Sequence, residues 1–277
     1  MARQDALELN SLAKHWQSAA DAFEKNLLAI ARRANHEAIH DARLAMKKLR
    51  SYATLYDDAT GSAIRKTVEK FALLYRAAGA CRDQYNALRL ARKFAQKLEC
   101  EFPLFDARLR FAMQSDLRYL RYALSACPVS TEDWRALKQA MPATKVSSAR
   151  LKPIRRVIEE RWESVEASDP PDDAETLHDL RKALKWILYC AQALPERDGS
   201  WQKLLKDIDE LCSLLGKWQD LHQFERRAKT FKESLLRKSV GEYALLKRLV
   251  KVVKAEKAAN HRAIARKFAS LRKARAA

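Results

Sequence analysis

Residues 40–50 of the chain read HDARLAMKKLR, and this stretch decides how the rest is interpreted. An α-helix turns by 100° per residue, so four nitrogen-bearing side chains of the stretch fall within an arc of about 80°. They are His40, Arg43, Lys47 and Arg50, with Lys48 beside them. Alanine, leucine and tyrosine residues gather on a different face, so one side of the helix can pack while the basic side is held toward an anion.

The same pattern occurs a second time in the sequence. His178, Arg181 and Lys185 follow His40, Arg43 and Lys47 at a constant offset of 138 residues, with Lys182 in addition. A second motif, GACRD at 79–83, is matched by GKWQD at 216–220, at an offset of 137. Two separate segments that keep nearly the same offset indicate an internal duplication. We therefore predict two repeats, residues 1–141 and 142–277, with a linker at 142–148.

The composition favours an all-α fold. Only five glycines and seven prolines occur in 277 residues, which leaves few turns for a sheet. Apolar spacing and breakers predict helices at about 5–33, 36–57, 62–78, 83–100, 103–126, 131–141, 149–167, 174–194, 199–215, 218–240 and 242–276. Gly79 and Gly216 are interpreted here as helix ends. Short connections predict up-and-down, four-helix-bundle-like halves about a pseudo-two-fold, whose basic faces line a shared central groove or channel.

The formal net charge of +19 points to a polyanionic partner. The five cysteines include no C-x-x-C pair and lie mostly in apolar surroundings, as expected of reduced core residues. The N-terminus lacks an apolar signal region, and no run is long enough to cross a membrane. We therefore expect a cytoplasmic protein without a membrane partner.

Further cations extend the predicted anion-binding site. Arg82, Arg89 and Lys93 align on one face of the helix expected at 83–100, and Arg226 occupies in the second half the place of Arg89. The candidate binding residues are thus His40, Arg43, Lys47, Lys48, Arg50, Arg82, Arg89, Lys93, His178, Arg181, Lys182, Lys185 and Arg226.

Two enzymatic interpretations are weaker. Residues 36–40 read HEAIH and match the H-E-x-x-H zinc motif, but the second copy has Ala174 in place of His36, and Arg43 and Lys47 would repel a dication. The pairs His40-Asp41 and His178-Asp179 resemble those of His-Asp metal phosphohydrolases, but no histidine lies between the two pairs to complete a site. We therefore expect no catalysis, no metal and no cofactor.

A nucleic-acid-binding module is the main alternative. Most aromatic residues fall on apolar faces, with Trp186 and Tyr189 as the expected exceptions, so the basic stripes have few stacking platforms. No helix-turn-helix or zinc-finger spacing occurs. A ligand that carries phosphates without bases fits the stripes better.

The duplicated His-x-x-Arg-x-x-x-Lys helices, each followed by a Gly-x-x-(Arg/Gln)-Asp motif, resemble the conserved-histidine α-helical domain, CHAD. The resemblance covers nearly the whole chain and implies a stand-alone CHAD protein. It further implies two four-helix bundles about a pseudo-two-fold, a basic central surface, binding of inorganic polyphosphate and association with polyphosphate granules. Trp186, Leu188 and Gln219 depart from the family pattern, so we expect the second half to bind more weakly.

Overall fold

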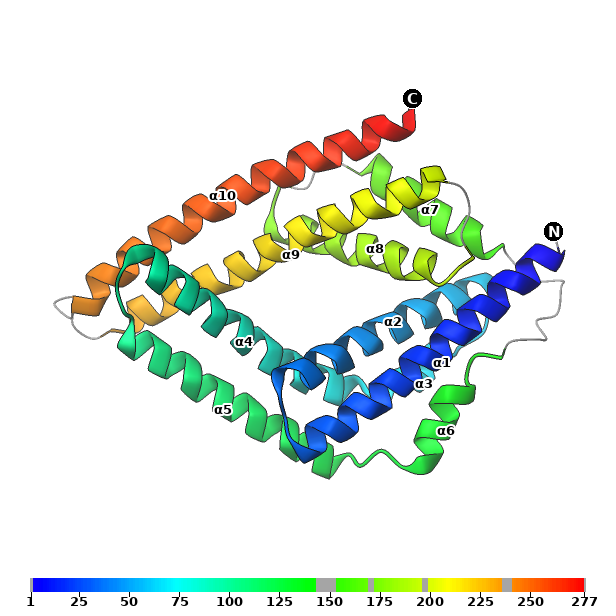
Figure 1. Ribbon diagram of the computed structural model, residues 1–277, viewed down its shortest axis with the longest axis horizontal. Coiled ribbons are helices and arrows are strands. Elements are labelled where there is room, and N and C mark those ends of the chain that lie inside the picture. Colours follow the sequence, from blue (N-terminus) through cyan, green and yellow to red (C-terminus); the bar gives the residue numbers. More distant parts are fainter. Residues whose placement is uncertain (1, 143–152, 169–171, 196–198, 236–240, 277) are drawn as a thin grey trace. The chain divides into compact units, whose positions relative to one another are not determined.

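The computed structural model describes residues 2–142, 153–168, 172–195, 199–235 and 241–276, and these ranges form ten helices and no strand (Figure 1). The all-α expectation is therefore confirmed. The helices are α1 (Ala2–Arg32), α2 (His36–Thr60), α3 (Arg65–Glu69), α4 (Ala72–Leu98), α5 (Pro103–Ala126), α6 (Thr131–Gln139), α7 (Ile154–Ala167), α8 (Ala174–Gln192), α9 (Gly199–Ser234) and α10 (Gly241–Ala276). None of the helices in these ranges combines the length and hydropathy needed to cross a bilayer.

The chain divides into two compact units. Unit 1 comprises Met1–Gly79, Tyr119–Asp169 and Lys182–Asp209, and unit 2 comprises Ala80–Arg118, Pro170–Arg181 and Glu210–Ala277. Each unit draws on both predicted repeats. The predicted linker lies almost wholly in 143–152, outside the described residues, and the repeat boundary at 141 stays a prediction.

In unit 1, α1 packs along α2 and buries an aromatic cluster. The Phe71 ring lies 5.4 Å from both Phe23 and Trp134, measured between ring centroids. Trp16 is fully buried, and its indole Nε1–H donates to the Leu137 carbonyl at 2.8 Å. Large apolar rings with satisfied polar atoms fix α6 against α1, so α2 is backed by a rigid layer.

In unit 2, a second aromatic core joins α4, α5, α9 and α10. Phe94 stacks on Phe224 at 5.8 Å, and Phe105 lies 5.9 Å from Phe224. Glu242 accepts hydrogen bonds from the backbone N–H groups of Leu104 (2.9 Å) and Phe105 (2.8 Å). This carboxylate meets the positive end of the α5 dipole and satisfies donors that the helix itself leaves open.

Several helix ends lie where the sequence predicted them. Pro103 opens α5, and α2 ends at Thr60, about three residues beyond the predicted end, where Gly61 follows with a φ of 72° in the left-handed region. The short helix α6 is capped by Ser130, which forms a capping box with Asp133.

The prediction that Gly79 and Gly216 end helices was wrong. Gly79 lies inside α4, and Gly216 lies inside the continuous helix α9. The expected helix at 62–78 is instead the short α3 followed by the first turns of α4. Gly79 makes room for the close approach of an arginine side chain, whereas Gly216 lies at an ordinary contact distance from one.

Candidate anion-binding site

The ladder on α2 lies in unit 1, and its central arginine packs against α4. The Arg43 Nη1–H donates to the backbone carbonyl of Tyr75 at 2.7 Å. The guanidinium carbons of Arg43 and Arg50 lie 4.5 and 5.3 Å from the centroid of the Tyr75 ring. Tyr75 thus orders both arginines of the ladder by cation–π contact.

Gly79 makes room for Arg43. An added Cβ at Gly79 would lie 3.1 Å from the Arg43 guanidinium carbon and closer still to Nη1. A residue with a side chain would therefore push the arginine out of its present position. The glycine inside α4 is explained by this approach of an α2 side chain.

The Arg43 guanidinium is only partly satisfied. Its Nε is buried and has no hydrogen-bond partner among the described residues. A buried donor without a partner costs free energy unless water or an ion supplies an acceptor. His40, Lys47 and Lys48 are half-buried on the same helix, and Arg50 is exposed.

The later half of α8 also belongs to unit 1. The Cys190 Sγ–H donates to the Ser51 carbonyl at 3.5 Å, so α8 contacts α2 here. Lys185 pairs with Asp209 at 3.1 Å, and Lys182 is exposed. The expectation that Trp186 and Tyr189 leave the apolar face was wrong, because both are buried: Trp186 is 7% and Tyr189 is 8% exposed.

In unit 2, arginines from α4 and α8 converge on one carboxylate of α9. Burial raises the pKa of Asp220, while the positive charges of Arg82, Arg89 and Arg181 act to lower it. Arg89 lies 3.6 Å from the Asp220 carboxylate, and the Asn86 amide donates to it at 3.2 Å. Three of the predicted site residues are thus brought together around Asp220.

Arg181 of α8 shares two features with Arg43, a neighbouring glycine and a buried Nε. Its guanidinium lies against Gly216 of α9, with an added Cβ 3.6 Å from Nε and Nη2. Its Nε is also buried and without a hydrogen-bond partner among the described residues. An arginine thus lies against a helical glycine once within each unit, but the approach is close only at Gly79 and is an ordinary van der Waals contact at Gly216.

The remaining predicted residues of unit 2 lie on α4, α8 and α9. Lys93 donates to Glu256 at 2.6 Å, and Lys97 and Lys217 each lie 3.5 Å from the same carboxylate. Burial opposes ionisation of Glu256, but the Lys93 hydrogen bond and these lysine charges together lower its pKa. His178 and Arg226 are exposed.

Three residues of this arrangement were not predicted from the sequence. Tyr75 and Glu256 carry no local signal, because their partners lie on other helices. Asp220 ends the repeated motif GKWQD, so its position could have been found from the repeat. These residues order the cations and would not themselves contact an anion.

The ring centroids of His36 and His40 are 6.4 Å apart, and the rings stack with an interplanar angle of 20°. Within the described ranges, no three His, Cys, Asp or Glu side chains come together as metal ligands would.

The fold and these clusters define an all-helical protein with arginines held half-buried on rigid helices. The family profile of the CHAD domain matches residues 14–229, and the chain belongs to this family. It is similar in fold to the CHAD domain from the plant Ricinus communis, with a TM-score of 0.72, 20% identity and coverage of 96% of this chain and 92% of that chain. It is also similar to PptA from Streptomyces chartreusis, with a TM-score of 0.69, 14% identity and coverage of 95% and 98%. No match was found among curated proteins.

Proposed function

We propose that this protein binds inorganic polyphosphate without turning it over, and that it does so at polyphosphate granules in the cytoplasm. The observation that carries the proposal is the paired arrangement of Arg43 and Arg181. Each guanidinium is held against a helical glycine and keeps a buried Nε–H without a partner among the described residues. Arginine matches phosphate oxygens with forked hydrogen bonds, so such donors suit a chain of phosphates.

The charge of the whole chain and its family support the same ligand. A formal net charge of +19 attracts polyanions over a distance and raises their local concentration. The predicted duplication would give the ligand two equivalent sets of contacts, one around Arg43 and one around Arg181.

The test removes two cations from each ladder. Arg43→Ala, Lys47→Ala, Arg181→Ala and Lys185→Ala together should weaken long-chain polyphosphate binding at least about a hundredfold, since each charged contact contributes roughly 1.5–3 kcal/mol. Helical content by circular dichroism should stay unchanged, and binding is measured by calorimetry.

A matched control removes four other positive charges. Arg108, Arg121, Lys247 and Lys251 are exposed on α5 and α10, outside the predicted site. Their joint replacement by alanine lowers the net charge equally and should reduce affinity only severalfold. Equal losses in the two variants would show that net charge alone binds the polymer.

Nucleic acid remains the rival ligand. Competition between polyphosphate and single-stranded RNA at equal phosphate concentration separates the two. We expect polyphosphate to displace RNA, because the ladders offer successive arginine and lysine side chains but no series of exposed rings on which consecutive bases could stack. Stronger binding of RNA would reverse the assignment, and release of phosphate on incubation with a divalent metal would reveal an enzyme.

A further inference from the structure

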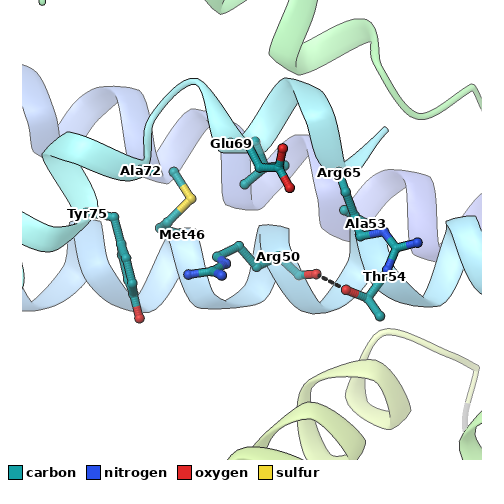
Figure 2. A pocket seen from close by; sticks show the side chains of 9 residues that line it. Met46, Arg50, Ala53, Thr54, Arg65, Glu69, Ala72 and Tyr75 are labelled. Carbon is teal, nitrogen blue, oxygen red and sulfur yellow. Dashed lines mark hydrogen bonds between the residues drawn. The ribbon is translucent and has the colours of Figure 1, made fainter. Parts of the chain in front are cut away.

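A cavity of about 110 Å³ lies within unit 1 between α2, α3 and the start of α4 (Figure 2). It is lined by Met46, Arg50, Ala53, Thr54, Arg65, Val68, Glu69, Ala72 and Tyr75. Arg50 and Tyr75 also belong to the cation–π cluster that includes Arg43. The cavity is therefore continuous with the α2 ladder.

The floor of the cavity is apolar and its rim is polar. Met46, Ala53 and Val68 are only 1%, 0% and 3% exposed, so the apolar surface open to a ligand comes from the partly exposed Ala72 and Tyr75. Arg50 and Glu69 are exposed. A phosphate group placed on this floor would lose water without gaining donors. A flat ring would instead bury apolar surface there. Apolar cavities of about 150 Å³ accept benzene, so this smaller cavity with an open rim can hold much of one ring.

The rim groups suit a ring that bears an amino group. Glu69 lies across the cavity from Arg50 (Figure 2), and a carboxylate accepts hydrogen bonds from an amine. The Arg65 Nε already donates to Asp57 at 3.0 Å, which leaves Arg50 as the rim cation that can stack on the ring. The charge of Glu69 repels phosphates, so the anionic part of a ligand would lie on the ladder side.

The ladder provides cations for that anionic part. Lys47 precedes Arg50 by three residues and Arg43 precedes Lys47 by four, so all three follow one face of α2. We propose that this cavity holds the amino-bearing ring of an adenine base, the rest of the base lying at the open rim, in a nucleoside triphosphate whose phosphates lie along Lys47 and Arg43. The inference rests on the proposed function, because it uses the same ladder for phosphate.

The experiment compares adenosine triphosphate with inorganic tripolyphosphate at equal ionic strength, without metal, by calorimetry. Stacking and burial of the base should make the nucleotide bind about fivefold tighter or more. Inosine triphosphate, which lacks the amino group, should bind severalfold more weakly than adenosine triphosphate. Equal affinities of adenosine triphosphate and tripolyphosphate for the unaltered protein would overturn the inference.

Two variants locate the effect in the cavity. Ala72→Leu places a larger side chain in it and should remove the preference for the nucleotide over tripolyphosphate, with long-chain polyphosphate binding retained. Glu69→Ala changes an exposed side chain and should make the affinities for the adenosine and inosine nucleotides equal. Retention of both preferences in both variants would place the base elsewhere and overturn the inference.

A third variant tests the shared phosphate contact, and the pattern of ligands bound separates this inference from the proposed function. Lys47→Ala should lower the affinities for adenosine triphosphate and for tripolyphosphate by the same factor, because it removes a phosphate contact shared by both. If the protein fails to bind long-chain polyphosphate but still prefers the nucleotide over tripolyphosphate, the proposed function fails while the cavity assignment stands. The opposite result leaves polyphosphate binding and removes the base site.

Discussion

Arg43 and Arg181 are held by contacts that leave part of their hydrogen-bonding capacity unused. Arg43 is fixed by the Tyr75 carbonyl and ring. Each of the two arginines also lies directly against a glycine of a neighbouring helix. A cation fixed in this way loses little conformational entropy when an anion binds. These two residues therefore account for more of the expected affinity than exposed lysines do.

Gly79→Ala should separate binding from stability. The new Cβ would displace the Arg43 guanidinium, whose flexible end can move, so polyphosphate affinity should fall about tenfold. Alanine gains up to about 1 kcal/mol of helix propensity, and loss of the Arg43–Tyr75 hydrogen bond costs a similar amount. The free energy of unfolding, measured with urea, should thus change by less than about 1 kcal/mol.

Gly216→Ala is the matched control. There the added Cβ meets Arg181 at an ordinary contact distance of 3.6 Å. Affinity should stay within about twofold while stability rises by about 0.5–1 kcal/mol. A similar loss of affinity in both variants would mean that helix rigidity, and not the position of Arg43, governs binding.

Asp220 should make the proposed polyphosphate binding depend on pH. Burial raises its pKa, so its carboxyl takes up a proton at a higher pH in the folded protein than in the unfolded chain. Protonation removes the internal counter-charge of Arg82, Arg89 and Arg181, with Asp83 the other carboxylate nearby. Affinity should therefore rise as the pH falls through the raised pKa, and the Asp220 contribution to stability is lost as the pH rises through it.

Asp220→Asn should bind polyphosphate about two- to tenfold more tightly at pH 7 and should flatten this part of the pH profile. Binding curves from pH 4.5 to 8 for both proteins isolate Asp220 from the titrating histidines. A variant with weaker binding and an unchanged profile would show that Asp220 acts only by aligning the arginines.

At the scale of the helices, the sequence predicted most of the helices but not the side-chain contacts between them. Proline and apolar spacing correctly located the start of α5 and the end of α2. Gly79 and Gly216 were misinterpreted because a glycine at a helix end and one beneath a neighbouring side chain look alike along the chain. The ladder residues are readable from 3.6-residue spacing, whereas their partners Tyr75 and Glu256 lie on other helices.

A buried ion pair joins three segments of unit 1. Arg155 of α7 donates to Glu8 of α1, and its Nη2–H donates to the Pro195 carbonyl after α8 at 2.6 Å. Arg155 is 7% exposed and Glu8 is 2% exposed. Removal of one partner leaves the other charge buried, so Glu8→Ala should lower the free energy of unfolding by about 3–5 kcal/mol.

The neighbouring surface pair provides the comparison for Glu8. Arg156 lies 3.2 Å from Glu163, with both side chains about half exposed. Glu163→Ala should lower the free energy of unfolding by less than about 1 kcal/mol, since exposed ion pairs contribute little to stability. Chemical denaturation of both variants measures the difference, and equal small losses would show that the Glu8 pair is no stronger than a surface pair.

At the scale of the whole molecule, the net charge of +19 was the first indication of a polyanionic ligand, and it also predicts how binding responds to salt. If the protein contacts about six to ten phosphates of the polymer, a plot of log affinity against log salt concentration should have a slope of about −4 to −7. This uses a slope of about −0.7 per contact for a flexible strand. Titrations with long-chain polyphosphate between about 50 and 200 mM salt measure this slope. Lys47→Ala should reduce its magnitude by about 0.7, because one phosphate contact is lost. A slope near −1 in the unaltered protein would contradict binding along two ladders, because so few released counterions correspond to a single local contact.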